Sequence, residues 1–483
     1  MRAPRQGQVD VELVETVGDD VVPAAEPGAD WRELLRRVPA RAWAVTAVVV
    51  ALSVGTVGAV EWRADRAQAA RLAETEGLTV SLAEPLAEVW RAPREGVVGV
   101  VGDVAVLHGG TSEGVLGVGV RGGETRWEQP AGGSGWCWLE RVGRDERGTG
   151  RWGAAPARIE PGEAVLACAD SRYSGSGEQG SDVTVVDPVT GSVLREFAMS
   201  GPGTGSTSEV DDGVASLGLD EEGRVVGSRW DLFTGERTWE YVGPRVEQGS
   251  QGVRTSSDGD TMTLASGQVS VTLDAWTGEV VGTEGSTRPV VQELDRLQLA
   301  DGGVAVSSVI GEERLELVVQ DEDGQQRFLT GGYALRPLVD DGSAPQTLLL
   351  SSPKRPGIMA VDARTGDELW RSRVSSWQVA VLAGLVVARD EQRITALDAR
   401  TGVTVWTRED PAPATGTRVL TDGRVLLTLV RGSDGGTDLL ARVAETGKEL
   451  WRAPAPVAEG YLEVLPDGRV LVLGAGETVA LAP

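Results

Sequence analysis

The sequence has few of the side chains on which metal and thiol chemistry depend. Among 483 residues there are one histidine and two cysteines, and lysine occurs only at Lys354 and Lys448. A structural zinc site takes four Cys, His or acidic ligands at close spacing, and this chain has no third thiol and no second histidine. The composition therefore gives no support to a zinc site.

Positive charge is also scarce. Lys and Arg number 46 against 72 Asp and Glu, which gives a formal net charge of −26. Nucleic-acid binding needs a basic surface that releases counterions from phosphates, so this balance argues against nucleic acid as a partner. The same acidity disfavours attraction of the main fold to anionic lipid headgroups.

Tryptophan and glycine, in contrast, are abundant. The 15 Trp outnumber the 4 Tyr and 3 Phe together, and there are 65 Gly. This skew indicates that Trp has a repeated structural role in a chain that turns often. Internal periodicity is therefore the first feature to look for.

Residues 42–60 form an uncharged run of nineteen residues, with Trp43 and Trp62 near its two ends. As a helix the run would be about 28 Å long, close to the hydrocarbon thickness of a bilayer. A buried soluble helix and a cleavable signal peptide are the alternatives. A polar leader of about forty residues is too long for the usual signal-peptide n-region, so we expect an uncleaved single-pass helix in the lipid bilayer.

The segment before this run indicates its orientation. Residues 1–41 are mostly polar and acidic, which predicts a disordered tail. Between Asp30 and Val38 apolar residues recur at helical spacing, which predicts a short amphipathic helix whose arginines face the inner leaflet. We therefore expect a cytoplasmic N-terminus, a linker at residues 61–80, and an extracellular domain at residues 81–483.

A repeat occupies the chain beyond residue 80. Its two clearest copies, residues 360–370 and 396–406, share the pattern Ala-x-Asp-Ala-Arg-Thr-Gly-x-x-x-Trp. Weaker copies lie before and after them, and degenerate ones end at Gly123 and Gly324. The repeat residues to which we assign a structural role are Asp187, Gly191, Asp231, Gly235, Trp239, Asp274, Gly278, Asp362, Gly366, Trp370, Asp398, Gly402, Trp406, Gly447 and Trp451.

Each position of the repeat has a physical reason. The Asp carboxylate accepts backbone N–H bonds inside a tight turn, and Gly takes the positive-φ position. The Trp that follows lies on the next strand, where it can bury about 200 Å² against the neighbouring unit. Short apolar runs such as residues 379–382, 385–388 and 394–397 lie between the motifs and predict an antiparallel meander.

The spacing of the repeat predicts an all-β propeller of four-stranded blades. Turn glycines are 36 to 46 residues apart, apart from a 68-residue step between Gly123 and Gly191. Eight motifs predict eight blades, with seven and nine as alternatives. Residues 88–93 echo residues 449–454, so the N-terminal copy is expected to supply an outer strand that closes the ring.

This motif resembles that of the pyrroloquinoline-quinone-like propeller repeat family, over about 400 residues. The family includes quinoprotein dehydrogenases, outer-membrane assembly scaffolds and extracellular sensor domains, so the resemblance implies a fold and not an activity. A dehydrogenase of this family would need a quinone, a calcium ion and an Asp base. It would often carry adjacent cysteines, which here stand thirty-one residues apart.

No residue is marked as catalytic by this comparison. The repeat Asp residues are accounted for by turns, and His108 is better explained as a strand-end residue than as an acid or base. Acidic loops at residues 211–213, 258–260 and 321–324 lack the full ligand series of a calcium loop and are expected to be solvated turns. We predict that the protein is not an enzyme and needs no cofactor.

Two functions remain. The first is a binding scaffold for an envelope protein, a peptide or a cell-wall ligand, and the second is a sensor that signals through residues 1–41. The loop at residues 143–161 is a candidate contact surface, with a disordered surface loop as the alternative. Cys137 and Cys168 are expected to form a disulfide outside the membrane.

Overall fold

The computed structural model of the protein describes most of the chain beyond residue 65. It covers residues 66, 68, 70–72, 75 and 77–483, except 110–113, 131–135, 142–157, 174–178, 201–203, 211, 247–252, 258–260, 267–268, 285–290, 311–313, 352–355, 377 and 411–417. The expected tail (1–41), the membrane helix (42–60) and half of the linker (61–80) lie outside these residues. Within the described part of the chain, no helix is both long and apolar enough to span a bilayer.

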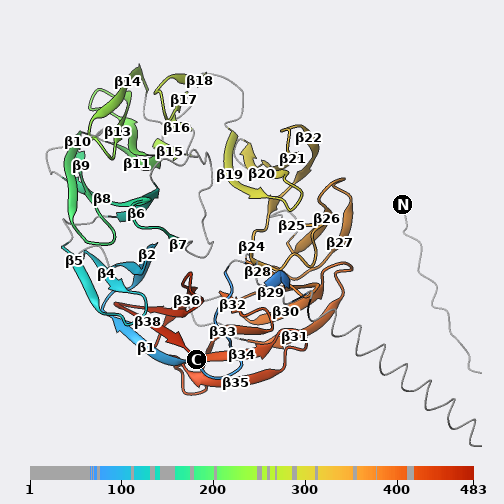
Figure 1. Ribbon diagram of the computed structural model, residues 1–483. Helices are drawn as coiled ribbons and strands as arrows, with labels where there is room; N and C mark the ends of the chain where they lie inside the picture. Colours follow the sequence, from blue (N-terminus) through green and yellow to red (C-terminus); the bar gives the residue numbers. More distant parts are fainter. Residues whose placement is uncertain are drawn as a thin grey trace, which may run out of the picture. The chain divides into compact units, whose positions relative to one another are not determined.

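The chain divides into two units, residues 1–67 and 68–483, and all described strands belong to the second. In that unit nine sheets follow one another around a ring (Figure 1). We number them as blades in chain order. Blades 1 to 3 consist of β2 (Gly96–Val101), β3 (Val104–His108), β4 (Val115–Gly119), β5 (Thr125–Gln129) and β7 (Arg158–Ile159); β6 (Trp136–Arg141), β8 (Ala164–Tyr173), β9 (Gln179–Val186) and β10 (Val193–Ser200); and β11 (Thr204–Val210), β12 (Gly213–Leu219), β13 (Arg224–Asp231) and β14 (Arg237–Arg245).

The next three blades have four strands each. They consist of β15 (Val253–Ser257), β16 (Thr261–Ser266), β17 (Val269–Asp274) and β18 (Val280–Glu284); β19 (Val291–Gln298), β20 (Val304–Ile310), β21 (Arg314–Gln320) and β22 (Gln326–Gly331); and β23 (Tyr333–Ala334), β25 (Thr347–Ser351), β26 (Ile358–Asp362) and β27 (Glu368–Arg371).

The last three blades complete the ring. They consist of β24 (Pro337–Asp340), β28 (Gln378–Leu382), β29 (Leu385–Arg389), β30 (Arg393–Asp398) and β31 (Thr404–Glu409); β32 (Val419–Thr421), β33 (Val425–Arg431), β34 (Thr437–Val443) and β35 (Glu449–Pro454); and β36 (Gly460–Val464), β37 (Val470–Gly474), β38 (Glu477–Ala482) and β1 (Ala87–Ala92).

The all-β prediction is confirmed, and the preferred number of eight blades is corrected to nine in the described residues. The ninth blade carries no Asp-x-x-Thr-Gly turn, because its outer strand comes from the other end of the chain. That strand is β1, which pairs antiparallel with β38, Ala87 opposite Ala482 and Ala92 opposite Thr478. The predicted closure by residues 88–93 is therefore what completes the ring.

Two blades carry a fifth strand on their inner edge. β7 pairs parallel with β2, Val100 opposite Arg158, and β24 pairs parallel with β28, Pro337 opposite Val379. In Figure 1 these inner strands lie toward the centre of the ring, whereas β10, β27 and β31 lie at its periphery. The passage through β7 explains the 68-residue step, since the chain leaves blade 2 after β6 and returns to it at β8.

Apolar clusters fill the seams between successive blades. Between blades 8 and 9, for example, Leu427 and Trp451 pack with Leu462 and Val472. Such clusters join blades 1–2, 2–3, 3–4, 5–6, 6–7, 7–8, 8–9 and 9–1. Among the described residues no such cluster joins blade 4 to blade 5.

Candidate functional site

The repeat aspartates lie in the turns between the third and fourth strands of their blades. The Oδ1 atom of Asp398 accepts the backbone N–H groups of Arg400 and Thr401 at 3.2 and 2.8 Å. The hydroxyl of Thr401 also donates to this carboxyl and lowers its pKa. The same pair of backbone bonds occurs at Asp187, Asp231, Asp274 and Asp362.

Every turn glycine of the repeat except Gly324 contacts an aromatic ring from the preceding blade. Gly402, with φ of +68°, leaves so little room that a Cβ there would lie 2.6 Å from Cδ2 of Trp370. The indole N–H of Trp370 donates to the carbonyl of Ala399 at 2.8 Å. Equivalent indole-to-carbonyl bonds join Trp90 to Val120, Trp127 to Pro188, Trp239 to Ala275, Trp406 to Ala444 and Trp451 to Leu82.

In the part of the chain that the structure describes, three seams lack this Trp bond. Phe328 contacts Gly366 between blades 5 and 6, and Phe197 with Arg195 contacts Gly235 between blades 2 and 3. Arg195 donates instead to the carbonyl of Thr234 at 2.7 Å. The third is the seam between blades 4 and 5. The repeat residues thus hold the blades together.

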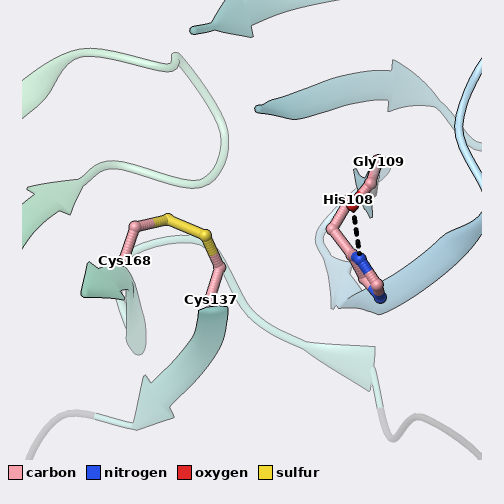
Figure 2. Close-up of a disulfide and its surroundings, with 4 residues drawn as sticks. All are labelled: His108, Gly109, Cys137 and Cys168. Atoms are coloured by element: carbon pink, nitrogen blue, oxygen red, sulfur yellow. Dashed lines mark hydrogen bonds between the residues drawn. A yellow bond between two sulfur atoms is a disulfide. The ribbon is translucent and has the colours of Figure 1, made fainter. Parts of the chain in front are cut away.

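Cys137 and Cys168 form the predicted disulfide. They lie directly opposite each other on β6 and β8, with Cα atoms 4.1 Å apart (Figure 2). His108 is at the exposed end of β3, and its Nδ1 lies 3.0 Å from the carbonyl oxygen of Gly109, apart from the disulfide in Figure 2. This is the strand-end position that the sequence indicates.

The acidic loops that resemble calcium loops behave as turns where they are described. Oδ1 of Asp321 accepts the backbone N–H groups of Asp323 and Gln325. Residues 258–260 lie outside the described residues, as does most of the loop at 143–161, of which β7 is part. No group of three or more His, Cys, Asp or Glu suited to a metal ion occurs among the residues described.

Carboxylates on or beside the inner strands form the most distinctive chemical feature. Glu209 on β11 is reached by solvent, yet the surrounding chain removes much of its hydration and raises the pKa of its carboxyl to about 7. Desolvation also raises the pKa of Asp340 on β24 and of Glu463 on β36. These three groups titrate higher than ordinary carboxyls because their ionised forms are poorly solvated.

Glu463 belongs to a small polar group on blades 8 and 9. Its carboxylate forms an ion pair with Arg418, which precedes β32, and the nearby Arg418 charge opposes the rise in the pKa of Glu463. Tyr461, two residues earlier on β36, is 41% exposed, and burial of its hydroxyl group raises its pKa. This combination of a charged pair and an accessible phenol suits recognition of a polar ligand.

A second charged group is buried between blades 7 and 8. Arg389, only 2% exposed, donates to the carbonyl of Leu429, and desolvation lowers its pKa to about 10. Asp410 accepts the hydroxyl of Thr428 at 3.0 Å and lies 3.6 Å from Nη2 of Arg442. The enclosure of this cluster fits a structural role within the seam.

Sequence reasoning did not find the inner-strand carboxylates or the buried arginines. Glu209 and Asp340 stand in segments without a motif, and their raised pKa values come from desolvation in the folded chain. The unusual feature of blade 4, a glycine at the Trp position of the repeat, can be read from the spacing, since Gly282 follows Gly278 by four residues as Trp406 follows Gly402.

The fold and these turns agree with a match to a known family. Residues 325–479 match the family model described as outer membrane protein assembly factor BamB. The chain carries pyrroloquinoline-quinone-like propeller repeats. The matched segment of these repeats runs from the end of blade 5 through blades 6 to 8 and into blade 9. No curated protein matches the sequence.

Solved structures are similar to the chain at low sequence identity. BamB from Moraxella catarrhalis is 17% identical with a TM-score of 0.41, and the alignment covers 83% of this chain and 100% of that one. Quinohemoprotein alcohol dehydrogenase from Comamonas testosteroni is 14% identical with a TM-score of 0.39, with 84% and 78% covered. Likenesses this distant carry no inference about the activity of the repeats.

Proposed function

We propose that the protein is a non-catalytic scaffold that binds a polypeptide of the cell envelope. The observation that carries this proposal is that two extended segments of the chain, β7 and β24, each pair in parallel with the inner strand of a blade. Backbone hydrogen bonding of this kind is a general way in which sheets bind peptides. The family match, to a model described as an assembly factor, agrees with it.

We further propose that residues 42–60 anchor the chain in the membrane and that the propeller is outside the cell. Support comes from the uncharged run itself and from the Cys137–Cys168 disulfide, because disulfides persist in oxidising compartments. Protease treatment of intact cells tests this placement. Degradation of the propeller without lysis is expected, and protection until lysis would contradict it.

The scaffold proposal is tested by photo-crosslinking in cells. A photoreactive residue replaces Tyr461, 41% exposed on the inner strand of blade 9, and a control carries it at Val403, 64% exposed beside an outer strand of blade 7. We expect one defined polypeptide adduct from position 461 and not from 403. Equal labelling at both positions would argue against an inner binding surface.

The catalytic alternative is tested separately on the full chain. Purified protein is titrated with pyrroloquinoline quinone and calcium, and dye reduction is followed on a panel of alcohols and sugars. We expect neither stoichiometric cofactor uptake nor turnover. Uptake with turnover would replace the scaffold by an enzyme.

A further inference from the structure

The chain enters and leaves the strand β6 by a path that differs from that of other inner strands. In blade 3 the inner strand β11 continues into β12 through a tight hairpin, with Val210 opposite Gly213. After β6 the chain instead adds β7 to blade 1, and it returns to blade 2 at β8 (Figure 1). Twenty-two residues separate Arg141, the end of β6, from Ala164, the start of β8. No hairpin therefore fixes the position of β6 beside β8.

The disulfide supplies the link that this path omits. Among the described residues β8 is the one strand that pairs with β6, and their antiparallel ladder begins with Trp136 opposite Ala169. Cys137 and Cys168 are the second pair of that ladder, at the opposite end of β6 from Arg141 (Figure 2). The bond closes a loop that contains β7, and it fixes the register that a hairpin fixes in blade 3.

β6 is less buried than the corresponding strands of other blades. Of its six residues Trp138 alone is buried, and the other five are half-buried. By contrast, four of the five residues of β28 in blade 7 and all three of β32 in blade 8 are buried. Segments with few buried contacts open at a low free-energy cost. Burial alone therefore holds β6 less firmly than it holds β28 and β32.

The side chains of β6 contact both neighbouring blades. The rings of Trp136 and Trp138 stack with centroids 4.3 Å apart and pack into the cluster between blades 2 and 3. On the opposite face Leu139 and the disulfide pack against the cluster between blades 1 and 2. Glu140 accepts the backbone N–H of Asp212 in blade 3 at 3.3 Å. These contacts position β6 in the ring, and they can form again after the strand has opened.

The disulfide is also placed where a thiol can reach it. Cys137 and Cys168 are both half-buried, and neither is sealed in the core. β6 is the inner edge of its sheet, and no described strand pairs with its other side. Thiol–disulfide exchange depends on such access, because a thiolate must attack one of the two sulfur atoms.

We propose that the Cys137–Cys168 disulfide is a redox switch that locks β6 into blade 2. A dithiol opens it in two steps. A thiolate of the dithiol attacks one sulfur and displaces the other cysteine, and the second thiol of the dithiol then releases the remaining cysteine from the mixed disulfide. Two electrons and two protons pass to Cys137 and Cys168, which become thiols, and the dithiol becomes a cyclic disulfide.

In the reduced chain β6 separates from β8, while β8, β9 and β10 stay paired with one another. The inner edge of blade 2 changes, and the other blades keep their strands. This inference goes beyond the proposed function, because it rests on the chain path, the burial of β6 and the disulfide.

Hydrogen–deuterium exchange with mass spectrometry tests the switch in the full chain, purified in detergent and kept well below its melting temperature. Exchange is measured before and after incubation with dithiothreitol. Two maleimide adducts per chain after denaturation establish complete reduction, since the chain has two cysteines. Peptides that cover β9 and β11 are internal controls for those that cover β6. β9 lies in the same blade, and β11 is an inner strand with a hairpin.

Reduction should raise the exchange rate of the β6 amides that bond to β8 on the order of a hundredfold, because the lost loop closure falls on this strand. β9 and β11 should keep their protection. Reoxidation with oxidised glutathione should restore the protection of β6. The C137S/C168S variant should exchange like reduced wild type and should not respond to dithiothreitol.

Unchanged exchange of β6 in fully reduced protein would overturn the inference, because packing alone would then hold the strand. A common rise in β6, β9 and β11 would also overturn it, since the disulfide would then stabilise the whole fold and not one strand. A native disulfide that resists dithiothreitol, or protection of β6 that reoxidation does not restore, would show that the bond is not a switch. All of these measurements use the wild-type chain, so they decide the question even where C137S/C168S does not fold.

Discussion

Trp451 donates its indole N–H to the carbonyl of Leu82, 2.7 Å away, although 369 positions separate the two residues in the chain. The bond joins the outer strand of blade 8 to the segment that leads into β1, the outer strand of blade 9. It is one of six indole-to-carbonyl bonds between blades in the described residues. It forms only when the N-terminal and C-terminal segments of the propeller are both folded.

Replacement of Trp451 by alanine should loosen this closure. The side chain is 9% exposed and packs in the cluster between blades 8 and 9, so its removal should cost about 3–5 kcal/mol of unfolding free energy. W451F keeps a ring and loses the N–H donor, and should cost about 0.5–1.5 kcal/mol beyond its smaller size. Urea unfolding of both variants checks this, and equal losses would show that the ring contributes little.

Alanine substitution at two turn glycines distinguishes the cost of backbone strain from the cost of a steric clash. Gly402 and Gly384 both have positive φ, +68° and +77°, but a Cβ would meet Trp370 at Gly402 and nothing at Gly384. G384A should therefore cost about 1–2 kcal/mol for the left-handed backbone alone. G402A should cost about 1–3 kcal/mol more, because the indole must move. Thermal unfolding measures both, and a G402A loss no greater than that of G384A would refute the contact.

Stability should fall with rising pH through the titration of Glu209. Its pKa in the folded chain is about 7, against a reference value of 4.5, so between pH 4.5 and 7 the folded state binds more protons than the unfolded state. The stabilisation is complete below pH 4.5 and is lost as the pH passes 7. E209Q should flatten this slope, whereas E236Q, which removes a charge from an exposed turn, should not. Melting curves from pH 4 to 8 make the comparison, and parallel slopes for wild type and E209Q would exclude the effect.

The disulfide should contribute to stability through the loop that it closes. For cysteines separated by 31 residues the chain-entropy model gives about 3–4 kcal/mol. Reduction should lower the melting temperature of wild type and leave that of C137S/C168S unchanged. Maleimide labelling should require reduction in protein taken from cells, and labelling of unreduced protein would contradict the expected compartment.

Features that repeat along the sequence, including the echo of residues 449–454 at 88–93, could be predicted, and short pairings without a repeat could not. Asp398, Gly402 and Trp406 stand at fixed spacing, since each turn uses the same backbone geometry. The prediction of eight blades came from the eight turn motifs, and blade 9 has no such motif because its outer strand β1 comes from the other end of the propeller. The strand β7 has two residues and no periodicity, so only its pairing with β2 reveals it.

Less of the candidate site could be predicted from the sequence. The raised pKa of Glu209 arises from desolvation in the folded chain, and no pattern around residue 209 signals it. Gly282, by contrast, was visible in the spacing.

Closure of blade 9 by β1 also sets the order of events during synthesis. β1 emerges before every other strand of the propeller, and its partner β38 emerges last. At about 5–20 residues per second, the 369 residues between Leu82 and Trp451 take roughly 20–70 s to make. Throughout that time the edge of β1 has no strand to pair with. A nascent chain of this kind is therefore a natural client for a holding chaperone, and loss of its last dozen residues would leave the ring unclosed.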